Sequence, residues 1–156
     1  FNNLDDLYAG INHVLQGNGA QAAIDFQRVA VNTTIGLGGL FDVGTKMGLQ
    51  KVYGDFGQTL GVWGASPGPY LVLPLLGPSN LRESLGRGFR IATDPRSYMD
   101  ESVSYGLMAL EYVDNRASSV ANAQLIAASS FDKYAFTRSL YMQRRAALVE
   151  AARERN

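Results

Sequence analysis

Residues 68–78 read Gly-Pro-Tyr-Leu-Val-Leu-Pro-Leu-Leu-Gly-Pro, and they lie within a longer segment, 56–81, that contains no charged side chain. A domain surrounded by water rarely leaves such a length uncharged unless the segment is buried or faces something apolar. Prolines at 67, 69, 74 and 78 each remove a backbone donor and fix φ, which excludes an ordinary core helix. The apolar run 70–76 is also far shorter than the ~20 residues of a membrane-spanning helix. We therefore predict a buried extended loop, or a re-entrant or interfacial segment held against lipid.

The composition favours one domain, residues 1–156, with a surface that is not entirely in water. Charged residues make up 18% of the chain, below the roughly 25% of typical soluble domains, although the apolar fraction of 46% is ordinary. The 14 basic and 14 acidic side chains balance, so no global field favours nucleic acid. The sequence has no cysteine and a single histidine, which excludes thiol chemistry and leaves little for a metal or a catalytic triad. We expect no cofactor and no metal.

Helical segments flank a middle that is rich in glycine and proline, and we predict an all-α fold. Apolar residues at positions 4, 7, 8, 11, 14 and 15 share one helix face. Similar reasoning predicts further helices over 19–34, 39–47, 55–63, 80–91, 96–127 and 131–153. The helix over 19–34 is apolar most of the way round, which predicts burial on more than one of its faces. Only residues 69–73 have a weak chance of forming a strand.

Local signals indicate where helices begin and where the chain turns. Asn3 and Asp55 are predicted N-caps, and Gly17 is predicted to end the first helix. Asp42 is expected in the first turn of a short helix, where a carboxylate suits the helix dipole. The motif Gly36-Leu-Gly-Gly follows a helix rather than a strand and lacks Gly-Lys-Ser/Thr. It therefore indicates a tight turn rather than a phosphate-binding loop.

The sequence gives little support to catalysis, and we predict that the protein is not an enzyme. His13 has Ala9, not a second ligand, four residues before it, so a satisfied or solvated histidine is favoured over a metal site. Asp42 and Asp55 could pair as acid and base, but no nucleophile accompanies them. No Gly-x-Ser-x-Gly elbow occurs, and Ser66 lies in no such context, which disfavours lipid hydrolysis.

Arginines are concentrated directly after the apolar run. Arg82, Arg87 and Arg90 are candidates for contact with a lipid headgroup, because guanidinium groups bind phosphate in a bidentate manner. A basic helix after an apolar segment suits a lipid interface, but a solvated helix face is equally compatible with the charges. The uncharged segment supplies the candidates for a membrane interface, where tryptophan and tyrosine are enriched. They are Trp63, Tyr70, Leu71, Leu73, Leu75 and Leu76.

Three stretches of the middle carry a specific resemblance. They are Asn32-Thr-Thr-Ile-Gly-Leu-Gly-Gly-Leu-Phe-Asp-Val43, Asp55-Phe-Gly-Gln-Thr-Leu-Gly-Val-Trp-Gly64 and Gly68-Pro-Tyr-Leu-Val-Leu-Pro-Leu-Leu-Gly-Pro-Ser-Asn-Leu-Arg82. With Asn12-His-Val-Leu-Gln-Gly17 before them and Tyr141-Met-Gln-Arg-Arg145 after them, they closely resemble the MlaA (VacJ) lipoprotein family of Gram-negative outer membranes. The similarity covers nearly the whole chain in order. The family's lipobox cysteine and first helices have no counterpart here, and its Asp-Pro-Tyr turn is replaced by Asp132-Lys-Tyr134.

The resemblance implies a ring-like helical protein in the inner leaflet of the outer membrane, facing the periplasm. Such a protein encloses a channel through which mislocalised phospholipids leave the outer leaflet, and this maintains lipid asymmetry. The implied partners are phospholipid, a trimeric outer-membrane porin and a soluble periplasmic carrier, MlaC, which feeds an inner-membrane transporter. No nucleic acid, cofactor or covalent reaction is implied.

Two expectations about mechanism accompany this resemblance. Gly36, Gly38 and Gly39 are candidate hinge or gating residues, so replacing Gly38 or Gly39 with valine should impair lipid flux without unfolding the flanking helices. The alternative function is a porin-bound structural adaptor without a lipid path of its own. The adaptor predicts that the three candidate arginines can become glutamine without loss of lipid transfer.

Overall fold

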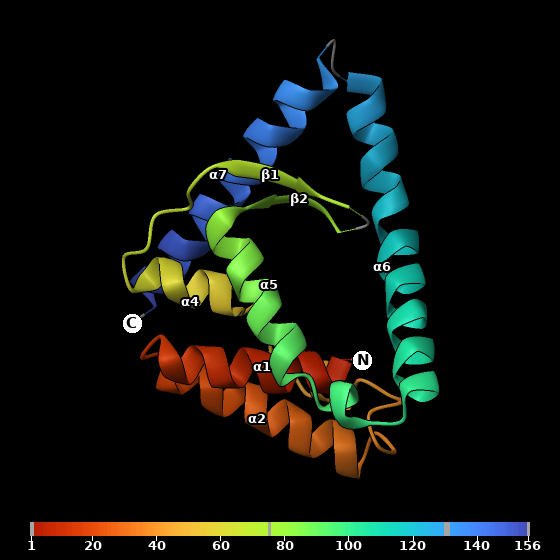
Figure 1. The fold of residues 1–156 in the computed structure, drawn as a ribbon. Coiled ribbons are helices and arrows are strands. Elements are labelled where there is room, and N and C mark those ends of the chain that lie inside the picture. The colour runs from red at the N-terminus through yellow and green to blue at the C-terminus, as the bar shows by residue number, and fades with distance from the viewer. Residues whose placement is uncertain (1, 75, 130–131, 156) are drawn as a thin grey trace. The chain divides into compact units, whose positions relative to one another are not determined.

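The computed structural model describes residues 2–74, 76–129 and 132–155, and most of them are helical, which confirms the predicted class (Figure 1). The elements are α1 (Asn2–Leu15), α2 (Gly19–Thr34), α3 (Val43–Lys46), α4 (Phe56–Val62), β1 (Tyr70–Leu73), β2 (Gly77–Asn80), α5 (Leu81–Thr93), the 3-10 helix η1 (Pro95–Tyr98), α6 (Glu101–Ser129) and α7 (Lys133–Glu154). The chain divides into two compact units, residues 1–66 with 147–156 and residues 67–146. A single domain and a ring-like shape stay predictions.

Unit one is built on α1 and α2, which pack side by side (Figure 1). Gly17 lies in the turn between them with φ of 87°, as predicted for the end of the first helix. A Cβ at Gly10 would lie 2.9 Å from the ring of Phe26, so the missing side chain allows the two helices to approach closely. The helix predicted over 39–47 is shorter than expected, because only Val43–Lys46 are helical in α3.

In the described part of the chain, five helices begin at a side chain that accepts a hydrogen bond from the backbone amide three residues later. These N-caps are Asn18, Asp42, Asp55, Asn80 and Asp132. The N-cap predicted at Asp55 is confirmed. Asp42 caps α3 rather than lying in its first turn, and Asn3 lies inside α1 rather than capping it. Each cap is a hydrogen bond within one turn of the chain and can therefore be recognised from local sequence. This explains why α2 and α4 begin within a residue of the predicted positions.

Unit two begins with a β-hairpin at the apolar run. β1 and β2 pair in antiparallel fashion, with Tyr70 opposite Asn80 and Leu73 opposite Gly77. The weak strand prediction over 69–73 is therefore confirmed by β1, within a chain that is otherwise mostly helical. The strand β2 has the sequence Gly-Pro-Ser-Asn, whose residue types are all poor strand formers or neutral, so periodicity gave no signal for it.

The remaining helices of unit two follow the hairpin directly. The helix predicted over 96–127 is wrong at its start, because residues 95–98 form η1 and α6 begins only at Glu101. Met99 is extended between them, with φ of −85° and ψ of 173°. α7 passes from unit two into unit one at Ala147. Among the described helices, none has both the length and the apolar character needed to cross a membrane.

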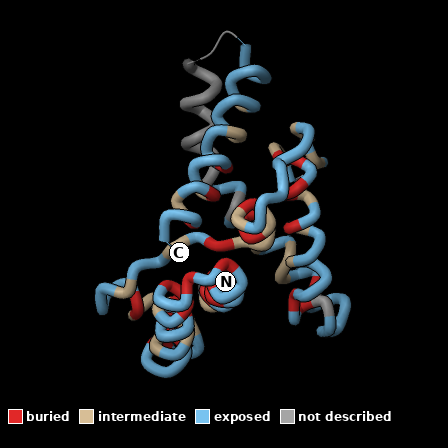
Figure 2. The backbone as a smooth tube through the Cα atoms, turned by 90° about the vertical axis from the view of Figure 1, so that its left-hand side faces the viewer, coloured by how far each residue is buried: buried red, intermediate tan, exposed pale blue. Residues whose placement is uncertain are grey.

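The interior of the described chain is mainly polar. Figure 2 shows where its buried residues lie along the backbone. The buried apolar side chains are small or medium in size, and they are Ala9, Ala22, Val149 and Ala152, all in unit one. The largest completely buried side chains are Arg28, His13, Gln58, Asn32, Asn80, Thr59, Asp6, Asp25 and Ser79. Globular proteins in water normally bury leucine, isoleucine, valine and phenylalanine and leave charged groups outside. The described part of this chain reverses that partition.

Candidate functional site

Helix α1 presents opposite chemistry on its two faces. Leu7, Ile11 and Val14 are exposed to 37%, 44% and 56%, whereas Asp6 and His13 on the other face are almost completely buried. The apolar periodicity of the sequence is therefore real, but it marks the outward face of the helix. A helix on the surface of a protein in water would place these side chains the other way round.

Helix α2 repeats the arrangement of α1. Its buried residues include Gln21, Asp25, Arg28 and Asn32, which share one helix face at the spacing of helical turns. The ring of Phe26 is 39% exposed on another side. The prediction that apolar residues would bury several faces of this helix is wrong, because the buried face is polar.

His13 and Asp25 form a buried pair between α1 and α2. His13 Nδ1 lies 2.5 Å from Asp25 Oδ2, and Gln21 Nε2 donates to the other carboxylate oxygen at 3.1 Å. Gly54 lies against the far edge of the imidazole, where a Cβ would be 3.0 Å from Nε2. The prediction of a satisfied histidine is confirmed at Nδ1. In the described part of the chain, no cluster of three histidine or carboxylate side chains could hold a metal ion.

Arg28 is completely buried and ties three segments together. Its Nε donates to Asp6 on α1 at 3.1 Å, and its Nη2 lies 3.2 Å from both carboxylate oxygens of Asp42. Its Nη1 donates to the Thr45 hydroxyl at 2.9 Å and to the Leu49 carbonyl at 2.7 Å. Burial raises the pKa of Asp42, but hydrogen bonds from Thr45 and Arg28 outweigh it and hold that pKa well below its usual value. All the guanidinium nitrogens thus bond to oxygen atoms inside unit one.

Polar side chains also connect α1 with α4. The Thr59 hydroxyl accepts a hydrogen bond from Gln16 Nε2 at 2.9 Å and donates one to Asn12 Oδ1 at 2.8 Å. Trp63, at the end of α4, is 57% exposed, and its indole N–H donates to the Leu15 carbonyl at 2.9 Å. An exposed ring with its polar edge satisfied is well suited to a boundary between apolar and polar surroundings.

The first headgroup candidate in unit two, Arg82, is paired inside the protein. Its guanidinium lies 3.0 Å from Glu83 Oε1, and the side chains of both residues are largely buried. The second carboxylate oxygen of Glu83 pairs with Arg145 of α7. One carboxylate therefore joins two guanidinium groups and links α5 to α7.

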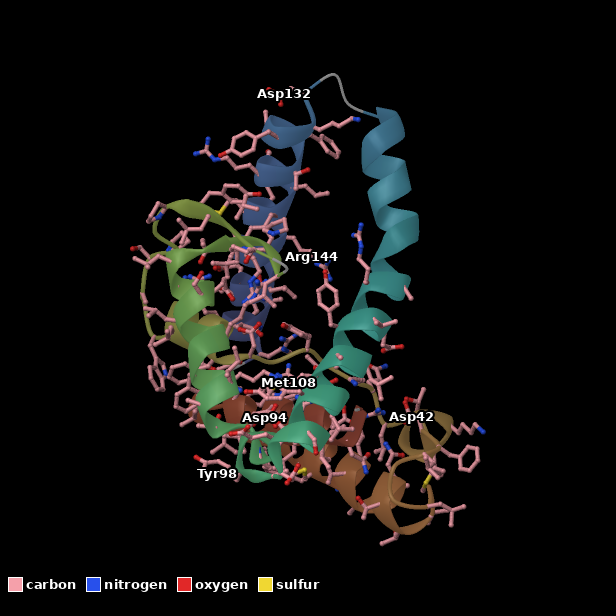
Figure 3. The ribbon with its side chains drawn as sticks, turned by 45° about the vertical axis from the view of Figure 1, so that its right-hand side comes forward. Asp42, Asp94, Tyr98, Met108, Asp132 and Arg144 are labelled. Carbon is pink, nitrogen blue, oxygen red and sulfur yellow. The ribbon has the colours of Figure 1, made fainter. Side chains whose placement is uncertain are left out.

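Arg90, a second candidate, belongs to a separate ion-pair network. Arg90 Nη2 lies 3.5 Å from Glu111, and Arg96 lies 2.6 Å from Glu111 and 2.5 Å from Asp94. Asp94 stands where α5 meets η1 (Figure 3). The hydrogen bond from Arg96 holds the pKa of Asp94 below its usual value despite burial, and the bond to Asp94 raises the pKa of Arg96. The network fixes the junction of α5 and η1 against α6.

Arg87, the third candidate, makes a different set of contacts. It is half-buried, and it donates to the carbonyls of Leu76 and Pro78 at 3.3 and 3.2 Å. Within the described chain Arg87 has no carboxylate at ion-pair distance, whereas Arg82 and Arg90 each have one. The structure thus separates the three arginines into different surroundings, and lipid contact by them stays a prediction.

The candidates for a membrane interface differ in exposure. Trp63 and Leu76 are exposed to 57% and 52%, while Tyr70, Leu71 and Leu73 are half-buried. The ring of Tyr70 packs edge-on against the rings of Tyr134 and Tyr141. Leu75 lies outside the described residues. The assignment of these side chains to a membrane interface stays a prediction.

Helix α5 carries an exposed apolar stripe that the sequence analysis did not identify. Leu81, Leu85 and Phe89 are exposed to 49%, 60% and 46%, and their spacing of four residues places them on one face. The buried residues Arg82 and Glu83 lie off this face. The signal was present as an apolar repeat between arginines, but the arginines were assumed to face outward.

The glycine motif after α2 forms a tight turn, as predicted. A Cβ at Gly36 would lie 2.3 Å from the carbonyl oxygen of Phe41 and 2.4 Å from that of Asn32, so no other residue fits there. Gly38 and Gly39 adopt φ of 71° and 91°, which other residues rarely adopt. The turn therefore requires glycine for its static geometry. Movement about these residues as hinges stays a prediction.

The polar pairs of unit one were missed by the sequence analysis, although part of the signal existed. Gln21, Asp25, Arg28 and Asn32 follow helical spacing, but the sequence analysis considered only the apolar residues of this helix. Each unit, taken by itself, has ion pairs inside and large apolar side chains outside. Such an arrangement can place apolar surface against lipid while keeping charges satisfied within the protein.

Comparison with known protein families gives a match along almost the whole chain. The family described as MlaA lipoprotein matches residues 1–148. An uncharacterized protein of Rickettsia bellii is 35% identical over 150 residues, which are 95% of this chain and 59% of that protein. The intermembrane phospholipid transport system lipoprotein MlaA of Escherichia coli is 34% identical over 145 residues, 91% of this chain and 57% of that protein. The chain thus spans less than two thirds of the length of these relatives.

A solved structure is similar in fold as well as in sequence. It was described under the heading "Structural basis for maintenance of bacterial outer membrane lipid asymmetry", and it matches with a TM-score of 0.78 and 31% identity. The match covers 94% of this chain and 75% of that chain. The helical fold described above is therefore shared with a protein of known structure.

Proposed function

This chain belongs to the MlaA lipoprotein family, and on that premise we propose that it is a component of a phospholipid transport system at the outer membrane of a Gram-negative bacterium. The Escherichia coli relative is named for intermembrane phospholipid transport, and the related structure concerns outer membrane lipid asymmetry. The proposed function is inferred from similarity to these proteins. The placement of this chain's own side chains gives it physical support.

The observation that carries the proposal is the reversed placement of polar and apolar side chains. Large apolar residues on α1 and α5 are exposed, and charged residues such as Arg28 and Glu83 are buried with partners. In hydrocarbon, exposed apolar surface carries no penalty, but every polar group must find its partner inside the protein. The exposed apolar faces of α1 and α5 suit surroundings of lipid acyl chains better than they suit water.

The finer proposal concerns what such a protein does in the membrane. It lies in the inner leaflet facing the periplasm, and it provides a channel through which mislocalised phospholipids leave the outer leaflet. A trimeric porin holds it in place, and a soluble periplasmic carrier of the MlaC kind receives the lipid. The support for these points is family membership, and direction of transport depends on the partners.

A porin-bound adaptor without its own lipid path remains the second candidate. The observation in its favour is that Arg82 and Arg90 are paired with Glu83 and Glu111, so these two arginines already have structural roles. Under this function the apolar surface would contact lipid and porin, but no lipid would pass through the protein.

The lipid surroundings can be tested with the single tryptophan of the sequence. Trp63 is exposed at the end of α4, so its fluorescence reports on what surrounds unit one. The chain is reconstituted into phosphatidylethanolamine–phosphatidylglycerol vesicles with and without brominated acyl chains. We expect bromine to quench Trp63 strongly and aqueous iodide to quench it weakly. Strong quenching by iodide alone would overturn the proposed location.

Lipid passage needs a separate measurement. Transfer of a fluorescent phospholipid from the reconstituted vesicles to the purified periplasmic carrier is followed over time. The channel function predicts transfer above the protein-free rate, and slower transfer when Gly38 or Gly39 is replaced by valine. The adaptor predicts quenching of Trp63 by brominated lipid together with no transfer above the protein-free rate.

A further inference from the structure

We propose that Arg87 is the phosphate-binding residue of unit two, and that its ligand is a phosphate group presented by a phospholipid or by free phosphate. The lipid source rests on the proposed function, and binding of free phosphate does not. Arg87 differs from Arg82 and Arg90, each of which pairs with a carboxylate.

Arg87 has no carboxylate at ion-pair distance in the described part of the chain. Glu83 lies one helical turn before Arg87 on α5, but its two oxygens are engaged by Arg82 and by Arg145. The side chains of Glu83, Arg82 and Arg145 are all largely buried. A half-buried guanidinium without a carboxylate partner favours the binding of an anion.

The hydrogen bonds of Arg87 leave it able to accept that anion. Its only partners in the described chain are the carbonyls of Leu76 and Pro78, at 3.3 and 3.2 Å. These distances are at or beyond the long end of ordinary N–H···O bonds, and a neutral carbonyl offers the guanidinium no opposite charge. A phosphate would supply two anionic oxygens that match the guanidinium fork. Arg87 therefore gains more from an anion than from its present partners.

The neighbours of Arg87 add uncharged groups to the same place. The side chains of Glu83, Arg145, Arg87 and Ser79 all lie close enough to Tyr141 to influence its titration. Desolvation by burial, followed by the charge of Glu83, raises the pKa of Tyr141, so the phenol keeps its proton. A neutral phenol beside the guanidinium does not repel a phosphate.

The experiment measures phosphate and phospholipid binding by four forms of the full chain. They are the wild type, Arg87→Gln, Arg87→Lys and the control Arg138→Gln, which removes the same charge from an exposed position of α7. Bound phospholipid is counted by native mass spectrometry after extraction from phosphatidylglycerol-containing membranes. Inorganic phosphate binding is measured by equilibrium dialysis of delipidated protein. Helical circular dichroism confirms that each variant is folded. If Arg87→Gln does not fold, the comparison of Arg87→Lys with the wild type still tests the proposal.

The outcomes separate the two sources of phosphate. Loss of at least about tenfold in phospholipid binding by Arg87→Gln, with an intermediate loss for Arg87→Lys and none for Arg138→Gln, supports a lipid headgroup as the ligand. The same pattern with inorganic phosphate alone supports a free-phosphate site. Equal binding by Arg87→Gln and Arg138→Gln in both assays overturns the proposal. The proposed function is tested separately from these binding assays. Absence of Trp63 quenching by brominated lipid would count against that function whatever Arg87 binds.

Discussion

Replacing Arg28 with methionine tests whether the polar interior of unit one holds the fold together. Methionine fills a similar volume but leaves Asp6, which is 1% exposed, and Asp42, which is 31% exposed, without their shared cation. Removing one partner of a buried ion pair costs about 3–5 kcal/mol. Lys51, 3.4 Å from Asp6 Oδ1, and the partial exposure of Asp42 reduce this loss. We therefore expect a loss near ~3 kcal/mol in the free energy of unfolding.

The assay is equilibrium unfolding by urea of the detergent-solubilised chain, followed by helical circular dichroism. A loss of ~3 kcal/mol raises the ratio of unfolded to folded protein by roughly a hundredfold or more. The matched control is Arg153→Met, whose side chain is 46% exposed, pairs with Glu150 at 3.6 Å and donates to the Gly61 carbonyl at 2.7 Å. The control should lose about 1 kcal/mol, well below the loss expected for Arg28→Met.

Two results bear directly on the reasoning about Arg28. Equal losses for Arg28→Met and Arg153→Met would refute the idea that buried ion pairs support unit one. Adding Asp6→Asn to Arg28→Met removes the unpaired buried charge and should recover part of the loss. A double variant that is less stable than Arg28→Met would contradict the assignment of that loss to the Asp6 carboxylate.

Further predictions concern one turn, one ion pair and one surface. Gly36→Ala should cost ~2 kcal/mol or more, because a Cβ would meet the carbonyl of Phe41 at 2.3 Å; an unchanged melting temperature would contradict this. The bond from Arg96 lowers the pKa of Asp94, so its stabilisation is present above the usual value of 3.8 and is lost as pH falls through the lower folded value. Urea titrations should therefore show wild type and Asp94→Asn converging in strong acid, and a constant difference would exclude this contribution. Leu85→Ser should weaken vesicle binding in flotation assays while leaving stability in detergent nearly unchanged, since Leu85 is 60% exposed.

Helix starts could be predicted from the sequence because the physics that sets them is local. Asp55 accepts a hydrogen bond from the amide of Gln58, and both partners lie within one turn of the chain. The same holds for the tight turn at Gly36, where the clash of a side chain is with backbone a few residues away. The hairpin was only half predictable, because β2 exists through pairing with β1 and not through its own propensity.

The direction in which each helix faces could not be predicted in the same way. Periodicity reports a contrast between two faces, and it assigns the apolar face to the inside only if the surroundings are water. His13 and Asp25 are 12 residues apart, and Glu83 and Arg145 are 62 apart, so their pairing depends on the tertiary fold. The low share of charged residues and the uncharged segment 56–81 were the sequence signals that pointed to different surroundings.

The small apolar core has a consequence for how the protein is made. Ala9, Ala22, Val149 and Ala152 offer little apolar area, and collapse in water gains only about 25 cal/mol per Å² of such area. Hydrogen bonds and ion pairs within the units strengthen once water is withdrawn from around them. We therefore expect the newly made chain to stay incompletely folded in an aqueous compartment and to depend there on a holding chaperone. The bilayer would then act as the last folding factor, and assembly and delivery to the membrane would be one event.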